Sequence, residues 1–394
     1  MDSDGRRTLR RIQGNDDTLK ELCLGNLYGD NDSTGTVWCW DPGDYQRLGK
    51  AIGKNTHVIK LEVAEEVATE NNANDDLITG LKQNSSITQL KLTGEHVDID
   101  GAGQQIVDAY QGKNQLTHLQ IWYCYLTHAS ITKTLKCNNL QDIELIYCQI
   151  TNEHLLPIIE AVRGRKSLEH LSFYGNSIGN AGCEAVATLL ADPNCNITNF
   201  DLRENSIGNE GAIMISDGLK SNIKLRRLFL HANPINNVQD DWDLQSAFSQ
   251  VLCNTSSVSS TYLSNHTLKY LEFPHFMNDQ LYDILELNED TNKQHVAIIK
   301  ILKNHPNIDM EPLFGWKTGG EWSLRALPYV IDWYGRAEEA AREGDHVCAC
   351  SVWKRELSAI YQFALAMPLL FVPAPRINVA CKKRKRKGNI HRYT

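Results

Sequence analysis

The sequence lacks the features that mark several large classes of protein. It begins with the polar stretch MDSDGRRTLRRIQGNDD, which contains no apolar core of a secretory signal. Its longest apolar stretch, residues 359–372, contains a glutamine and a proline and falls short of the roughly 20 apolar residues that a membrane helix needs. The 11 cysteines are odd in number and spread singly, which indicates reduced thiols. These absences predict a soluble intracellular protein with no membrane contact.

Motifs of the common enzymes are absent as well. There is no G-x-x-x-x-G-K-[ST] phosphate loop and no G-x-S-x-G nucleophile elbow. The compact group of metal-type ligands is His346, Cys348 and Cys350, whereas zinc takes four ligands at fixed spacing. We therefore expect no enzyme activity, no metal and no cofactor. An enzyme that uses residues 292–373 is the less favoured alternative.

Charge is unevenly distributed along the chain. The net charge is −8, but residues 375–394 hold eight basic residues and no acid, which leaves 32 basic and 48 acidic side chains on the body, about −16. An acidic body opposes nucleic-acid binding, apart from weak contact by the tail. The tail contains a solvated block of six basic residues that resembles a nuclear-import signal, with a solubilising tail as the alternative. The block is Lys382, Lys383, Arg384, Lys385, Arg386 and Lys387. We expect a cytoplasmic location, with the nucleus as the alternative.

What the sequence does contain is a repeat. LEHLSFYGNSIGNAGCEAVATLL, residues 168–190, reappears in altered form as ITNFDLRENSIGNEGAIMISDGL, residues 197–219. The template L-x-x-L-x-L-x-x-N-x-L describes both segments, with cysteine in place of asparagine in the copies that begin at Leu116 and Leu140. Its copies, weaker near the two ends of the array, begin at Val58, Ile87, Leu116, Leu140, Leu168, Ile197, Leu225 and Leu268.

Each part of the template has a physical role. The two apolar residues of L-x-L point to one face of a short strand. The asparagine after them can bond backbone groups that the turn leaves unpaired. Apolar residues at steps of three and four in residues 181–190 then predict a helix. Asn84, Asn138 and Asn222 close such helices, and we expect them to adopt the left-handed conformation that ends a helix.

One strand and one helix cannot bury their apolar faces alone, but stacked copies can. The spacing of the copies and the N-x-I-G-N-x-G-A segment, residues 205–212, resemble the leucine-rich-repeat superfamily, in particular its ribonuclease-inhibitor-like class. The resemblance implies an α/β solenoid, or horseshoe, with a parallel β-sheet on the concave side and helices on the convex side.

The repeat also divides the chain into segments. A solenoid needs a cover at each end of its core, and the region after the repeats holds four of the eight tryptophans. We predict a disordered N-terminal segment at 1–34, an N-terminal cap at 35–55, about eight leucine-rich repeats at 56–290, a helical C-terminal cap at 291–373 and a basic disordered tail at 374–394.

Template positions 3, 5 and 7 should face away from the core, onto the concave surface. These positions, with a tyrosine at the rim, combine aromatic and charged side chains, which protein interfaces concentrate as hot spots. The alternative is that the rings pack against one another across neighbouring strands or beneath a cover. The candidate binding residues are His118, Gln120, Trp122, Glu144, Tyr147, His170, Tyr174, Asp201, Arg203, Arg227, Phe229 and His231.

The sequence therefore predicts an intracellular interaction module or scaffold, monomeric, that binds a protein partner on its concave face. Rigid strands would present the binding side chains with little loss of backbone entropy. A regulator of a GTPase, which ribonuclease-inhibitor-like repeats sometimes resemble, is the alternative. The expected hot spots are Trp122, Tyr147, Tyr174 and Phe229, and the expected charged contacts are Arg203, Asp201 and Glu144.

Overall fold

The computed structural model describes residues 3–305 except 26–41, 65–73, 99–101, 112, 114, 128–132, 134, 136, 138, 236–241 and 274–278. The chain divides into two compact units, Met1–Ile301 and Leu302–Thr394. The elements below belong to the first unit, apart from the end of the last helix. The basic tail, the group around His346 and most of the predicted C-terminal cap lie outside the described residues.

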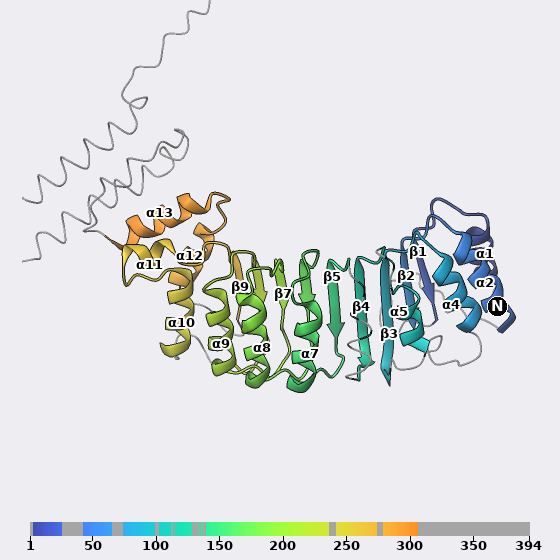
Figure 1. Cartoon of the computed structure of the whole chain (residues 1–394), viewed down its shortest axis with the longest axis horizontal. Helices are drawn as coiled ribbons and strands as arrows, with labels where there is room; N and C mark the ends of the chain where they lie inside the picture. Colours follow the sequence, from blue (N-terminus) through green and yellow to red (C-terminus); the bar gives the residue numbers. More distant parts are fainter. Residues whose placement is uncertain are drawn as a thin grey trace, which may run out of the picture. The chain divides into compact units, whose positions relative to one another are not determined.

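Nine strands form one parallel sheet in which the spatial order follows the sequence order (Figure 1). Each strand pairs only with its neighbours in sequence, as a solenoid requires. The strands are β1 (Glu21–Leu24), β2 (Lys60–Ala64), β3 (Gln89–Asp98), β4 (His118–Tyr125), β5 (Asp142–Ile146), β6 (His170–Ser172), β7 (Asn199–Asp201), β8 (Arg227–Phe229) and β9 (Tyr270–Glu272).

Helices connect the strands and pack side by side along the convex side, so that α8 lies between α7 and α9 (Figure 1). The predicted α/β leucine-rich-repeat solenoid is confirmed. The helices are α1 (Ser3–Gln13), α2 (Pro42–Lys54), α4 (Asn74–Gln83), α5 (Ala102–Asp108), α7 (Asn152–Val162), α8 (Asn180–Ala191), α9 (Asn209–Leu219), α10 (Trp242–Leu252), α11 (Val258–Tyr262), α12 (Asp279–Leu287) and α13 (Lys293–Asn304).

The core lies between the sheet and the helices and consists of the template's apolar positions. In the copy that begins at Leu168, the first three apolar residues are at most 1% exposed. The register aligns equivalent positions of successive copies, so that Leu171 pairs with Phe200 and Phe200 with Leu228. A buried apolar side chain therefore recurs at the same template position at each step of the sheet, about 4.8 Å apart.

A ladder of buried asparagines explains the asparagine of the template. Asn205 is 7% exposed. Its Oδ1 accepts the amide of Ile178 at 2.9 Å, and its Nδ2 donates to the carbonyls of Phe173 at 2.9 Å and Leu202 at 3.1 Å. Asn176 and Asn233 make equivalent bonds one repeat before and one repeat after. Each side chain thus joins the turn of its own repeat to that of the preceding repeat.

Cysteine replaces this asparagine in two copies and makes weaker bonds. The Sγ of Cys148 donates to the carbonyls of Ile121 at 3.1 Å and Ile146 at 3.3 Å. It bridges two repeats as Asn176 does, but it is only a weak donor and acceptor. Cysteine therefore retains the geometry of the ladder with less hydrogen-bond strength.

The asparagines at the helix ends do not act as the sequence predicted. Asn84 and Asn222 are absent from the described residues with positive φ. The Oδ1 of Asn84 accepts the amides of Ser86 and Ile87, and its Nδ2 donates to the carbonyl of Ile52 in the preceding repeat. The expectation of a left-handed turn is wrong at these two residues because the side chain, rather than the backbone, satisfies the helix end. Asn138 lies outside the described residues.

The N-x-I-G-N-x-G-A segment builds the start of each helix. The Oδ1 of Asn180 accepts the amide of Gly208 at 2.7 Å. A Cβ on Gly211 would lie 2.8 Å from the same oxygen, so glycine is needed for the close approach of α8 and α9. Asn152 and Gly179 repeat this bond one helix earlier, at 2.8 Å.

The prediction of a disordered segment at 1–34 is wrong for residues 3–25. These residues form α1 and β1, and β1 pairs with β2 as the first strand of the sheet. Leu19, Leu22 and Leu24 are buried and fit the spacing of the template, so the signal was present, although leucine stands at the asparagine position. The predicted N-terminal cap contains α2, which packs against α1 and α4 as a repeat helix does.

Among the described residues, no helix has both the length and the apolar character needed to cross a bilayer.

Candidate functional site

The sheet face opposite the helices presents aligned rows of polar and aromatic side chains. The register places His118, Asp142 and His170 in one row, continued by Asn199 and Arg227. A parallel row, one step along the strands, contains Gln120, Glu144, Ser172, Asp201 and Phe229. Template positions 3 and 5 therefore face the concave side, as the sequence predicted.

Three tyrosines meet at the carboxyl ends of the strands. The rings of Tyr123 and Tyr147 stack with centroids 5.0 Å apart, and Tyr174 meets Tyr147 edge-on at 5.3 Å. The hydroxyls of Tyr147 and Tyr174 donate to the two oxygens of the Glu204 carboxylate at 2.5 and 2.6 Å. These hydrogen bonds lower the pKa of Glu204, that from Tyr147 most strongly. We call Tyr123, Tyr147, Tyr174 and Glu204 the tyrosine cluster.

The backbone of this edge holds the cluster in place. The residue after template position 7 has positive φ in five successive copies, at Tyr123, Tyr147, Gly175, Glu204 and Ala232. This left-handed conformation costs residues other than glycine about 1 kcal/mol or more in free energy. Three members of the tyrosine cluster, Tyr123, Tyr147 and Glu204, nevertheless adopt this conformation. Backbone strain of this kind concentrates at functional sites.

Gly175 makes room for the ring of Tyr147. A Cβ on Gly175 would overlap ring atoms of Tyr147, and its φ of 69° favours glycine. The sequence of the repeat that contains Gly175 does not predict this contact, because Tyr147 belongs to the preceding repeat.

An arginine links the tyrosine cluster to two further aromatic residues. Arg203 lies 5.2 Å from the ring centre of Tyr174 and 5.1 Å from that of Phe229. Its Nε and Nη2 donate to the Asp201 carboxylate at 3.1 and 2.6 Å, and the hydrogen bonds with Asp201 raise the pKa of Arg203. Phe229 in turn contacts Tyr270 at 5.3 Å. The Asp201 side chain is 8% exposed, so its charge holds Arg203 in position.

Trp122 belongs to a separate network on β2 to β5. Its Nε1 donates to Glu144 Oε2 at 3.2 Å, and the ammonium of Lys91 lies 3.8 Å above its ring. Lys91 also pairs with Glu62 at 2.6 Å. The Glu62 carboxylate, the Lys91 ammonium, the Trp122 ring and the Glu144 carboxylate thus follow one another across four neighbouring strands.

The predicted residues fall into two groups in the structure. Contacts on the concave side join Trp122 to Glu144 and join Tyr147, Tyr174, Arg203, Asp201 and Phe229 into one chain. Arg227 and His231 are exposed, and His118, Gln120 and His170 are half-buried. Four residues that make these contacts were not among the predicted binding residues: Lys91, Tyr123, Glu204 and Tyr270. Lys91 and Tyr270 stand at template positions predicted to face the concave side, and Tyr123 stands at the predicted rim.

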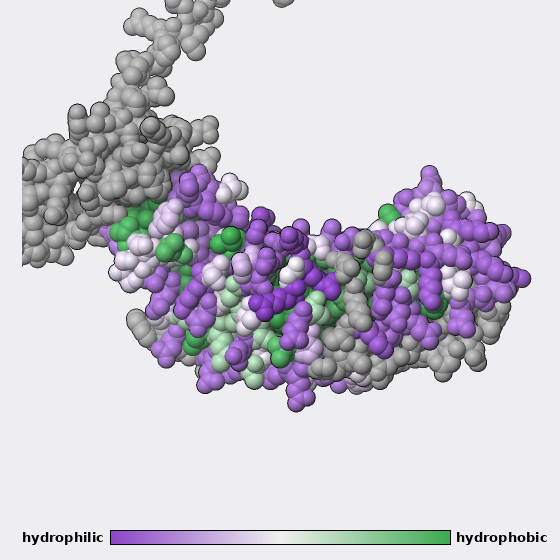
Figure 2. All heavy atoms as spheres, in the orientation of Figure 1, coloured by the Kyte–Doolittle hydropathy of each residue, from purple (hydrophilic) through white to green (hydrophobic). Residues whose placement is uncertain are grey.

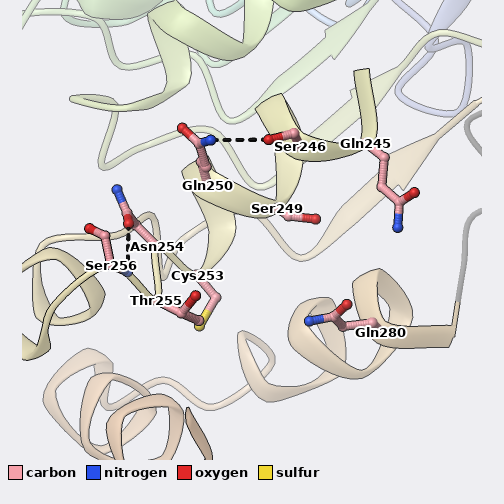
Figure 3. A pocket seen from close by; sticks show the side chains of 9 residues that line it. All are labelled: Gln245, Ser246, Ser249, Gln250, Cys253, Asn254, Thr255, Ser256 and Gln280. Atoms are coloured by element: carbon pink, nitrogen blue, oxygen red, sulfur yellow. Dashed lines mark hydrogen bonds between the residues drawn. The ribbon is translucent and has the colours of Figure 1, made fainter. Parts of the chain in front are cut away.

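Cavities among the described residues offer no evident chemistry. A cleft of about 510 Å³ lies between α10, the loop that follows it and α12 (Figure 3). Glutamine, serine, asparagine and threonine line it together with Cys253. Burial raises the pKa of the Cys253 thiol, which is the opposite of what a nucleophile needs. The described elements show a largely hydrophilic surface with small hydrophobic areas in the view of Figure 2.

Comparisons with known proteins agree with this geometry. A family model described as leucine-rich repeat matches residues 166–187 and 194–216. Ribonuclease inhibitor of Sus scrofa is 33% identical over 99 residues, which cover 24% of this chain and 22% of that protein. Protein CARMIL of Dictyostelium discoideum is 22% identical over 185 residues, which cover 39% of this chain and 18% of that protein.

A human relative matches the same part of the fold. The NACHT, LRR and PYD domains-containing protein 5 of Homo sapiens is 27% identical over 154 residues, covering 38% of this chain and 13% of that protein. The chain thus spans less than a quarter of the length of these relatives. Leucine-rich-repeat proteins typically mediate protein–protein interactions and serve as binding scaffolds rather than enzymes. The repeat, the nine-stranded parallel sheet and these similarities identify the chain as a leucine-rich-repeat protein of the ribonuclease-inhibitor-like class.

Proposed function

We propose that this protein binds a protein partner on its concave face, through the tyrosine cluster and the neighbouring Arg203, Phe229 and Trp122. The observation that carries the proposal is the unbroken chain of contacts from Tyr123 through Arg203 to Tyr270, on a face that helices leave open. Tyrosine, tryptophan and arginine are enriched at interface hot spots. By its name, the ribonuclease inhibitor relative acts on another protein, which supports a protein ligand here.

Internal contacts supply preorganisation, which the proposal requires. Glu204 fixes two tyrosine hydroxyls and Asp201 fixes the guanidinium of Arg203, so these side chains lose little rotamer freedom when a partner binds. Tyr123 and Tyr270 remain 40% and 46% exposed and can bury further area. Glu144 and Asp201 act here by holding neighbouring side chains, and Arg227 and His231 provide exposed contacts at the margin.

Affinity capture from native cell extract tests this function. The wild-type chain is compared with a Trp122→Ala/Tyr174→Ala/Phe229→Ala variant. A matched control replaces exposed apolar side chains of the helices, Leu156→Ala/Met214→Ala. All three proteins must first give the same circular dichroism spectrum.

The proposal expects a protein captured by the wild type and the control but lost by the concave-face variant. Loss of a single hot spot typically weakens binding by about 2 kcal/mol, roughly 30-fold. Equal capture by both variants would refute the concave face as the binding site. A GTPase among the lost proteins would favour the regulator as the more specific function.

We also propose that the chain is a cytoplasmic monomer, with the nucleus as the alternative location, reached through the block Lys382–Lys387. The basic composition of the block supports import as that alternative. Replacement of the six basic residues by serine should abolish nuclear accumulation of a fluorescent fusion. Unchanged nuclear accumulation would leave the block as a solubilising tail. Sedimentation velocity of the purified chain tests the monomer.

A further inference from the structure

Three potential metal ligands from two neighbouring strands meet near the middle of the concave face, and a fourth candidate, His118, lies on the next strand. Asp142 and Glu144 lie on β5, His170 lies on β6, and His118 lies on β4 beside Asp142 in the register. Ligand atoms of Asp142, Glu144 and His170 all lie within 4.8 Å of one another. The sequence predicted no metal site, because these residues are distant in sequence and only the sheet brings them together.

One carboxylate oxygen of this group has no hydrogen-bond donor. Oδ1 of Asp142 is buried and has no hydrogen-bond partner, and an unsatisfied buried oxygen is costly. A cation at this point would satisfy the oxygen and relieve the repulsion between the two carboxylates.

Neighbouring side chains orient two of the ligands, Glu144 and His118. Trp122 donates to Oε2 of Glu144, while Oε1 lies 3.9 Å from Nε2 of His170. Thr117 donates its hydroxyl proton to the carbonyl of Thr88 and lies 2.9 Å from Nδ1 of His118. Nδ1 of His118 therefore donates to Thr117, which makes Nε2 the nitrogen with the lone pair. Such contacts behind the ligands are typical of metal sites.

We propose that His118, Asp142, Glu144 and His170 bind one divalent transition-metal ion, with zinc as the best fit. Imidazole together with carboxylate suits the borderline ions, whereas magnesium and calcium prefer oxygen ligands alone. In a tetrahedral zinc site the ligand atoms lie about 3.4 Å apart, so the side chains would close by about 1 Å on binding. This proposal goes beyond the binding of a protein partner and does not depend on it.

Zinc binding to the full-length chain tests the site, measured by competition with a chromophoric chelator and by isothermal titration calorimetry. Asp142→Asn and His170→Gln each remove one ligand while keeping side-chain volume. Asn199→Ala, in the same row of the sheet on the next strand, is the matched control. Circular dichroism confirms that each variant is folded, and because the His170 side chain is 26% exposed, its variant should fold even if Asp142→Asn does not.

The proposal expects about one zinc ion per chain, bound at least about tenfold more weakly by both ligand variants and equally well by the control. Cobalt substitution should give a visible spectrum of nitrogen and oxygen ligation without a thiolate charge-transfer band. The proposal is overturned if no stoichiometric zinc binds or if both variants bind as the wild type does. A thiolate band would likewise overturn it, because the metal would then be held by cysteine.

Discussion

The asparagine ladder gives the sharpest prediction, for the change Asn205→Ala. The substitution removes the acceptor of the buried Ile178 amide. The carbonyls of Phe173, Leu202 and Arg203 lose one donor each but keep another, from Asn176, Asn233 and the Gly175 amide respectively. One buried group therefore becomes unsatisfied, and three others lose a shared bond. An unsatisfied buried group costs about 1–3 kcal/mol and a typical bond about 1 kcal/mol, so we expect a total loss of about 2–4 kcal/mol.

The assay is urea-induced unfolding followed by far-ultraviolet circular dichroism, with hydrogen exchange at the Ile178 amide as a local probe. Asn205→Cys should destabilise less than Asn205→Ala, because Cys148 makes the equivalent bridging bond in its own repeat. Asn199→Ala, on the concave face, is the matched control and should change the free energy of unfolding by less than about 0.5 kcal/mol. Equal effects of Asn205→Ala and Asn199→Ala would refute the structural role of the ladder.

Three further predictions concern single side chains. Gly175→Ala should lower the free energy of unfolding by about 1–3 kcal/mol and displace the Tyr147 ring. Thermal unfolding would detect the first effect and tyrosine fluorescence the second. An unchanged melting temperature would contradict the close contact. Hydrogen bonds from Tyr147 and Tyr174 lower the pKa of Glu204 below its ordinary 4.5, so its contribution is present above pH 4.5 and lost as the pH falls through the folded value. Because Glu204 is exposed, the Glu204→Gln variant should differ in stability from the wild type by less than about 1 kcal/mol at pH 6, and urea unfolding should show that the difference shrinks as the pH falls below 4.5. Burial lowers the pKa of Lys300 to about 7, so the unfolded chain binds more protons than the folded chain between pH 7 and pH 9. The free energy of unfolding should therefore rise by about 1–3 kcal/mol over this range. Urea unfolding at the two pH values should show this rise in the wild type and not in Lys300→Met.

The template predicted the fold well because each of its positions has one physical role. Apolar positions 1, 4 and 6 are buried, and positions 3 and 5 face the concave side, as a period of two requires. The predicted ends were less accurate. Leu22 and Leu24 lie in a first strand, β1, and Leu19 is buried just before it. The polar composition of the segment led us to predict disorder, because composition does not show the spacing of three buried leucines.

The candidate site was predictable in its location and not in its contacts. Sequence gives the face on which Tyr174 and Arg203 lie, but not that Arg203 lies against two rings or that Asp201 holds it there. Contacts between side chains of neighbouring repeats depend on rotamers and on the left-handed turns after each strand. The apolar periodicity of the sequence predicts neither the rotamers nor the left-handed turns.

The cysteines at the asparagine position have a consequence for how the solenoid comes apart. The stability of a repeat protein is the sum of terms within repeats and terms between neighbours. Where Cys148 replaces an asparagine, sulfur makes the bridging bond between repeats, and the term between neighbours is smaller. We therefore expect the array to behave as two cooperative blocks under partial denaturation, with the boundary between β4 and β5. Asn176, Asn205 and Asn233 join the repeats of β5 to β8, so these repeats should open as one unit.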